Sequence, residues 1–79
     1  MEEQQINEMH QELIALASAY AGNCSACLAY HIRRALEVGA TADQVRHAIE
    51  IASRVKIVAW KRSDELADKM IAETIIQAA

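Results

Sequence analysis

The sequence contains no proline and no phenylalanine, and its only glycines are Gly22 and Gly39. Proline and glycine are the residues that most often interrupt helices. The intervals between the two glycines and the chain ends are filled largely with helix-forming residues. The sequence therefore predicts an all-α fold, a small helical domain of three to four helices.

Aromatic residues are also scarce, since Tyr20, Tyr30 and Trp60 are the only three among 79 residues. Much of the 53% hydrophobic content is alanine. A chain of this length forms at most one domain, here residues 1–79, and buries only about 60% of the surface of its unfolded state. Small apolar side chains let helices approach closely, and burying them usually requires neighbouring subunits. We therefore expect a homo-oligomer that completes the fold.

The chain has neither a strong charge of one sign nor a long hydrophobic run. Its net charge is −3, with acids and bases interspersed, so we expect no nucleic acid partner. No run approaches the roughly 18 apolar residues of a membrane span, so we expect no membrane partner. The acidic and polar start, Met1 to Gln5, is unlike a signal peptide. These features predict a cytoplasmic protein.

The spacing of apolar residues predicts the first two helices. A stripe with a spacing near 3.6 marks the first helix, and Gly22 is expected to be the left-handed residue that closes it. Asn23 is expected to cap a second helix that runs from Cys24 to about Val38 and ends at Gly39. The apolar stripes of these two helices consist of Ile6, Met9, Leu13, Leu16, Ala17 and Tyr20, and of Leu28, Ile32, Ala35 and Leu36.

A capping box starts the next predicted helix, with Thr41 as the cap and Gln44 reaching back to it. The expected buried face of that helix consists of Val45, Ala48, Ile49, Ala52 and Val55. The β-branched residues between Val55 and Trp60 then predict a kink or a helix boundary. A last helix is expected to run through Leu66 to Ile75.

The only two cysteines stand close together and are followed by a histidine, in the order Cys24, Cys27 and His31. In a reducing compartment such a CxxC pair is more often catalytic, redox-sensing or metal-binding than structural. On an ideal helix the three positions fall within about 60° of arc. His31 is four residues from Cys27, which makes the two side chains neighbours, but seven residues from Cys24. We therefore expect His31 to act as a base for Cys27.

Glu12 stands beside the apolar stripe of the first helix, where its carboxylate could face the second helix and orient His31. In a simple helical hairpin Glu12 lies about one turn farther from the connecting loop than His31 does. We expect a tilted crossing, a bridging water or an adjoining subunit to close this gap.

These four residues together form a recognisable pattern: Glu12, eleven residues, Cys24-x-x-Cys27, three residues, His31. The pattern resembles the signature of the alkylhydroperoxidase D family, within the carboxymuconolactone decarboxylase-like superfamily. The turn from Ala35 to Thr41 is also similar, and the resemblance covers about residues 8–55. It implies an all-helical homo-oligomer, a trimer or a hexamer, that reduces hydroperoxides with thiols.

By matching position, Cys27 resembles the thiol that attacks the peroxide and Cys24 the thiol that resolves the product. Glu12 and His31 resemble the proton relay. The resemblance implies no bound cofactor, but an external dithiol reductant protein, of a dihydrolipoamide-like kind. The founding enzymes often have a histidine where this sequence has Ala26. We therefore expect a weaker relay here.

Other functions remain compatible with the same residues. One is a disulfide reductase or dithiol carrier that reacts with disulfides and not with peroxides. Another is a non-catalytic oligomeric module that binds a partner or a metal, with Cys24, Cys27 and His31 as ligands and Glu12 or another subunit as the fourth. The spacing of these residues on one helix is awkward for tetrahedral zinc. His10 and His47 are interpreted as surface or boundary histidines.

Overall fold

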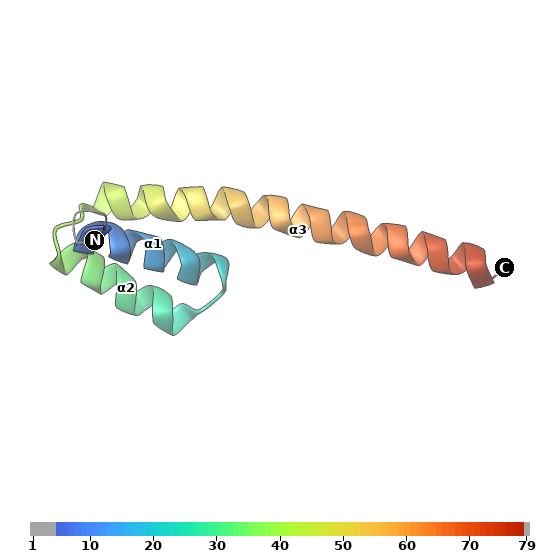
Figure 1. Cartoon of the computed structure of the whole chain (residues 1–79), viewed down its shortest axis with the longest axis horizontal. Coiled ribbons are helices and arrows are strands. Elements are labelled where there is room, and N and C mark those ends of the chain that lie inside the picture. Colours follow the sequence, from blue (N-terminus) through green and yellow to red (C-terminus); the bar gives the residue numbers. More distant parts are fainter. Residues whose placement is uncertain (1–4, 79) are drawn as a thin grey trace.

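The computed structural model describes residues 5–78, and these residues form three helices and no strand. The helices are α1 (Glu8–Ala21), α2 (Ser25–Glu37) and α3 (Ala42–Ala78). Figure 1 shows α1 and α2 as an antiparallel hairpin, with the first half of α3 lying along α1. The all-α fold predicted from the composition is confirmed.

The core lies where α1 packs against both other helices, because α2 and α3 contact each other very little. Leu16 of α1 and Ala35 of α2 are completely buried, and Ala40 and Val45 complete the buried cluster. Around it pack partly buried residues from the predicted stripes: Met9, Leu13, Leu28, Ile32, Ala48 and Ile49. The position of α1 between its neighbours explains why its stripe contributes the largest fully buried side chain.

The turn between α1 and α2 differs from the prediction by one residue. Gly22 has an ordinary φ of −86°, and the left-handed residue is Asn23, with φ 59°. Asparagine tolerates this conformation better than most residues, and its side-chain oxygen here accepts a hydrogen bond from Lys56 of α3. Cys24, and not Asn23, is therefore the N-cap of α2.

The turn between α2 and α3 has the predicted local structure. Gly39 follows the end of α2 with φ 105°, a conformation that favours glycine. The backbone N–H of Thr41 donates to Gln44 Oε1 at 2.8 Å, and the N–H of Gln44 donates to Thr41 Oγ1 at 3.1 Å. This reciprocal pair confirms the capping box.

The predicted kink or boundary between Val55 and Trp60 is wrong, because α3 continues through it as one helix of 37 residues. β-branched residues lower helix propensity only slightly, and no proline or glycine interrupts this segment. Val55 and Leu36, both expected in the core, are 62% and 48% exposed. Val55 lies near the end of the contact between α3 and the hairpin, where little remains to cover it.

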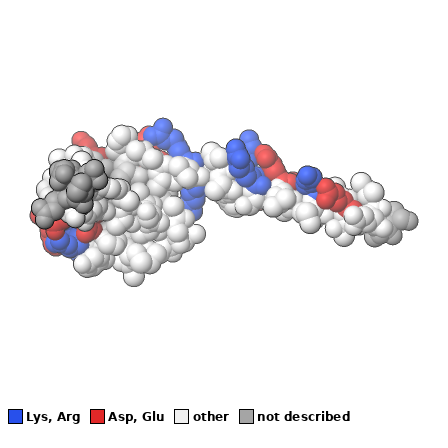
Figure 2. Space-filling view, in the orientation of Figure 1, with Lys and Arg blue, Asp and Glu red and all other residues white. Residues whose placement is uncertain are grey.

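We call residues 57–77, the part of α3 that extends beyond the hairpin, the arm. Every residue of the arm is exposed, and the molecule measures 60 × 29 × 19 Å because of it. Figure 2 shows the charged residues of the arm along one edge, while the opposite edge is uncharged. No helix among residues 5–78 combines the length and the apolar character needed to cross a bilayer.

Candidate active site

The two cysteines lie at the start of α2, where the helical hairpin turns. Cys24 and Cys27 are joined by a disulfide, with Cα atoms 5.2 Å apart, within the usual range for such a bond. The backbone N–H of Cys24 donates to the carbonyl of Ala19 at 3.0 Å, which fixes the cysteine to the end of α1. The hairpin turn itself thus brings the sulfur atoms to the N-terminus of a helix.

Cys24 was predicted to be the first residue of the second helix. It is instead the N-cap residue, one position before α2 begins at Ser25. Its Sγ atom accepts a hydrogen bond from the backbone N–H of Cys27 at 3.2 Å. Free N–H groups and the positive end of the helix dipole favour negative charge at this position. After reduction of the disulfide, these groups would stabilise a thiolate on Cys24.

The two sulfur-bearing residues differ in their access to solvent. Cys27 is exposed, whereas Cys24 is partly buried. A small hollow of about 200 Å³ lies beside Cys24 and is lined also by Tyr20, Leu28 and Lys56. We call it the Cys24 hollow. Cys27 as a whole residue is therefore the more exposed of the two, while Cys24 faces the hollow.

Glu12 and His31 are in direct contact across the interface of α1 and α2. His31 Nδ1 and Glu12 Oε2 are 2.6 Å apart, and the two side chains are 29% and 16% exposed. The contact forms within one chain and without a bridging group, so the gap expected from a simple hairpin is absent. An ionised carboxylate can only accept a hydrogen bond, so Nδ1 donates and Nε2 is left to exchange a proton.

A second ion pair links the same two helices, about one helical turn from the Glu12–His31 contact. Arg34 of α2 donates to Glu8 Oε1 of α1 at 3.0 Å and to Glu37 Oε2 at 2.8 Å. The hydrogen bond to Glu37 raises the pKa of Arg34 above its ordinary value, so the guanidinium stays charged. Beside the Glu12–His31 contact, this exposed pair is a second polar contact between α1 and α2.

Lys56 is a residue near the cysteines that the sequence interpretation missed. It extends from α3 to the hairpin turn, where its Nζ atom donates to Asn23 Oδ1 and lies 3.5 Å from the carbonyl oxygen of Tyr20. The same ammonium lies 5.1 Å from the centre of the Tyr20 ring. Nothing in the local sequence distinguishes this lysine from a solvated one, because its partners are more than thirty residues away.

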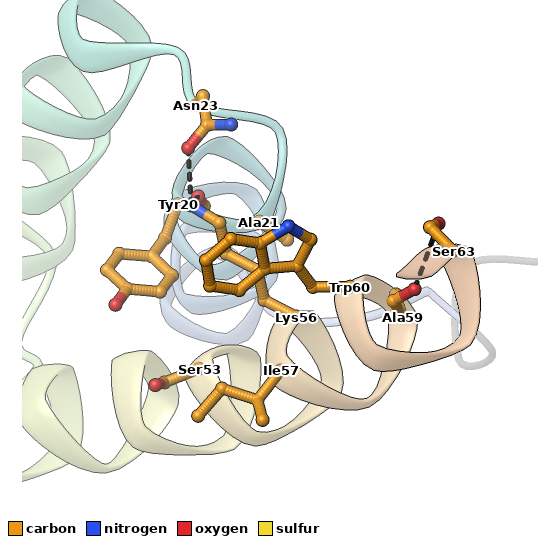
Figure 3. Close-up of a pocket in the computed structure, with 9 residues that line it drawn as sticks. All are labelled: Tyr20, Ala21, Asn23, Ser53, Lys56, Ile57, Ala59, Trp60 and Ser63. Atoms are coloured by element: carbon orange, nitrogen blue, oxygen red, sulfur yellow. Dashed lines mark hydrogen bonds between the residues drawn. The ribbon is translucent and has the colours of Figure 1, made fainter. Parts of the chain in front are cut away.

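A larger hollow of about 560 Å³ shares Tyr20, Asn23 and Lys56 with the Cys24 hollow and extends to Trp60 at the base of the arm. We call it the Trp60 hollow. Figure 3 shows the rings of Tyr20 and Trp60 facing it, with Ile57 of α3 beneath them. Cys24 therefore lines one of two adjacent hollows, and the other extends along α3 to Trp60.

The comparison with protein families agrees with the resemblance seen in the sequence. The model of the Carboxymuconolactone decarboxylase family matches residues 1–59. This chain belongs to that family. Searches among curated proteins and among solved structures found no significant match. The family match contains the hairpin, all four predicted site residues and Lys56, and it ends at the base of the arm.

In this member of the carboxymuconolactone decarboxylase family, the site combines a pair of sulfur atoms with an oriented imidazole. Such a set can exchange two electrons through its disulfide and one proton through its histidine. Among the residues that the structure describes, no group of three or more His, Cys, Asp and Glu side chains is arranged to hold a metal ion. His10 and His47 are exposed, as predicted.

Proposed function

We propose that this protein is a thiol-dependent peroxidase that reduces hydroperoxides through the Cys24–Cys27 pair. The observation that supports this most strongly is the 2.6 Å contact between Glu12 and His31. It provides a carboxylate-oriented imidazole one helical turn after Cys27, which is the arrangement that activates a nucleophilic thiol. The family membership is compatible with such a redox role.

In the first step His31 accepts the proton of the Cys27 thiol through its Nε2 atom. The Cys27 thiolate attacks the terminal oxygen of the hydroperoxide, so that a sulfur–oxygen bond forms as the oxygen–oxygen bond breaks. The leaving alkoxide takes the proton from His31 and departs as an alcohol. The sulfur of Cys27 has lost two electrons and is now a sulfenic acid. The hydroperoxide has gained these two electrons and is now an alcohol.

In the second step the thiolate of Cys24 attacks the sulfenic sulfur of Cys27. The disulfide forms, and the hydroxyl leaves as water with one proton. The N-cap position of Cys24 supports this role because it favours the thiolate form. An external dithiol then reduces the disulfide by exchange and becomes a disulfide itself. A cytoplasmic location, which we also propose, would supply such a reductant.

The test is a steady-state assay of hydroperoxide consumption with dihydrolipoamide as the dithiol. We expect turnover by the wild-type chain and none by Cys27→Ser. The matched control is Ser25→Ala, which changes an exposed side chain between the two cysteines and should leave the rate unchanged. If Cys27→Ser retains the full rate, the assignment of the attacking thiol is wrong.

A disulfide reductase is the second candidate, and the exposure of Cys27 favours it because a bulky disulfide could reach this sulfur. Ala26 in place of a second histidine points the same way, since disulfide exchange needs less proton transfer than peroxide cleavage. The same assay, with dihydrolipoamide as the reductant, distinguishes the two functions when a different disulfide, oxidised glutathione, and a hydroperoxide are compared as oxidants. Turnover of the disulfide alone would reject the peroxidase proposal.

A further inference from the structure

The Cys24 hollow gives small molecules a route to one of the two cysteines. Cys24 lines this hollow, whereas Cys27 lines neither the Cys24 hollow nor the Trp60 hollow. The Cys24 hollow has a volume of about 200 Å³, which is the space of about seven water molecules at about 30 Å³ each. It can therefore admit the thiol end of a small molecule, but not the surface of a folded protein.

Lys56 gives both hollows a positive charge. Among residues 5–78 it is the only charged side chain that lines either hollow, in a chain whose net charge is −3. Its Nζ atom is held at the hairpin turn by the side chain of Asn23 and the carbonyl oxygen of Tyr20. These contacts use two of the three N–H groups of the ammonium, so one remains for a ligand. We therefore expect an anionic group of the ligand to lie beside Lys56.

The Trp60 hollow continues from Lys56 along α3 and is mostly apolar. Its volume of about 560 Å³ lies within the range of about 300–1,000 Å³ that is usual for ligand sites. The rings of Tyr20 and Trp60 line it together with Ile57 (Figure 3), and Ser63, the lining residue farthest along α3, adds a hydroxyl. The two hollows together thus suit a molecule with an anionic group at one end and an apolar chain behind it.

We propose that the reductant of the disulfide is a dithiol on a slender apolar chain, and that it attacks Cys24 rather than Cys27. The inference rests on the thiol cycle proposed above, in which an external dithiol restores the two cysteines. The attacking thiolate lies in the Cys24 hollow beside Lys56, and the apolar chain lies against Tyr20 and Trp60. The hydroperoxide and the reductant then react with different sulfur atoms, the first with Cys27 and the second with Cys24.

The reduction proceeds in two exchange steps, in which electrons and protons balance. First the thiolate attacks Cys24 Sγ, so that a new sulfur–sulfur bond forms as the bond to Cys27 breaks, and Cys27 leaves as a thiolate. The second thiolate of the reductant then attacks the first reductant sulfur, and Cys24 leaves as a thiolate at the N-terminus of α2. The two cysteines gain two electrons and the two protons that the reductant thiols released. The reductant loses the same two electrons and becomes a cyclic disulfide.

The first experiment identifies the sulfur that is attacked in the wild-type chain. A monothiol cannot complete the second step, so β-mercaptoethanol leaves a mixed disulfide on the chain oxidised with diamide. The reaction is quenched early with acid, the freed thiol is blocked with N-ethylmaleimide, and tandem mass spectrometry locates both groups. We expect β-mercaptoethanol on Cys24 and N-ethylmaleimide on Cys27. A mixed disulfide that forms mainly on Cys27, or equally on both, would overturn the proposal.

The second experiment tests the charge of Lys56 by measuring how fast dithiols release free thiols from the oxidised chain. Lys56→Met should slow reduction by dihydrolipoamide and by dithiothreitol roughly two- to fivefold, because the attacking thiolate loses a nearby cation. Arg54→Met removes an exposed charge two residues earlier in α3 and should reduce at the wild-type rate. Wild-type rates in Lys56→Met with both dithiols would overturn the proposal.

The third experiment tests the apolar chain by comparing dihydrolipoamide with dithiothreitol, which has no such chain. In Trp60→Ala the ratio of the two reduction rates should fall roughly two- to tenfold, because one aromatic contact with the chain is lost. Trp60→Phe keeps an aromatic ring and should keep most of the preference. Trp60 is 72% exposed, so neither substitution touches the core. An unchanged ratio in Trp60→Ala would reject the Trp60 hollow as the site of the chain.

The outcome of these experiments is independent of the peroxidase proposal. The disulfide is formed with diamide, and only its reduction is measured. A chain that fails to consume hydroperoxide can therefore still be attacked at Cys24, and a working peroxidase can still be attacked at Cys27.

Discussion

Glu12 of α1 and His31 of α2 are in direct contact, and this contact orients His31 for the proposed proton transfer from Cys27. Glu12→Gln keeps the size of the side chain and one hydrogen-bonding oxygen but removes the negative charge that supports the imidazole as a base. We expect the rate of peroxide-driven disulfide formation to fall by about 10- to 100-fold, less than the roughly 10²- to 10⁴-fold contribution of a complete general base, because His31 itself stays in place. Loss of free thiols after rapid mixing with hydroperoxide measures this rate.

Glu8→Gln is the control for that variant, because it changes the same residue type one turn earlier in the same helix. Glu8 contacts Arg34 at 3.0 Å and lies on the surface. Its removal should leave the rate of disulfide formation within about twofold of wild type, since exposed ion pairs contribute little. Equal rates for Glu12→Gln and Glu8→Gln would contradict a specific role for Glu12.

Lys56 provides the positive charge that lines the Cys24 hollow. In a chain that carries Cys27→Ser, Cys24 is the only thiol, and its alkylation by iodoacetamide near neutral pH reports the fraction of thiolate. We expect Lys56→Met to slow this alkylation several-fold, because the thiolate loses a nearby cation. Arg54→Met removes an exposed charge two residues earlier in α3 and should have no effect. An unchanged or faster reaction in Lys56→Met would exclude this electrostatic role.

The difference between Glu12 and Lys56 shows how much of the site the sequence could predict. The sequence predicted four site residues as one group, because their spacings along the chain form a pattern: Glu12, Cys24, Cys27 and His31. Lys56 acts through contacts with Tyr20 and Asn23 that depend on how α3 crosses the hairpin. Such a contact exists only once the helices are packed, and no local pattern indicates it.

At the scale of the element, the capping box at Thr41 makes the start of α3 the clearest test of local stability. Thr41→Ala removes the oxygen that accepts the Gln44 N–H, and such losses cost about 1 kcal/mol. Urea unfolding should show this decrease. Ser18→Ala serves as the control, because the Ser18 hydroxyl donates a hydrogen bond to the carbonyl of Ile14 within α1. Its loss should change stability by about 0.5 kcal/mol or less. Equal losses would contradict the capping role.

The ends of the helices were predictable where one residue type dominates the geometry. Gly39 has a positive φ, and the Thr41–Gln44 pair forms because both side chains are local to the turn. The α1–α2 turn was misjudged because glycine and asparagine both tolerate left-handed conformations. Lys56 donates a hydrogen bond to Asn23, and this bond favours Asn23 as the left-handed residue of the turn. The sequence around the turn does not indicate it, because Lys56 belongs to α3.

At the scale of the whole molecule, the arm is the feature that the sequence predicted least well. Its apolar residues were expected to form a separate last helix. Instead α3 runs on without interruption, because no residue between Val55 and Trp60 breaks a helix. Hydrophobic periodicity indicates that a face is buried, but not whether the same chain or another one buries it.

The central claim of this account is that Cys27 and Cys24 have unequal roles in one peroxide-driven cycle. The most direct measurement treats reduced Cys24→Ser and Cys27→Ser variants with hydroperoxide in the presence of dimedone, followed by mass spectrometry. We predict a dimedone adduct on Cys27 in the first variant, because its sulfenic acid cannot be resolved, and little or none on Cys24 in the second. An adduct that forms as fast on Cys24 as on Cys27, or on neither, would contradict the claim.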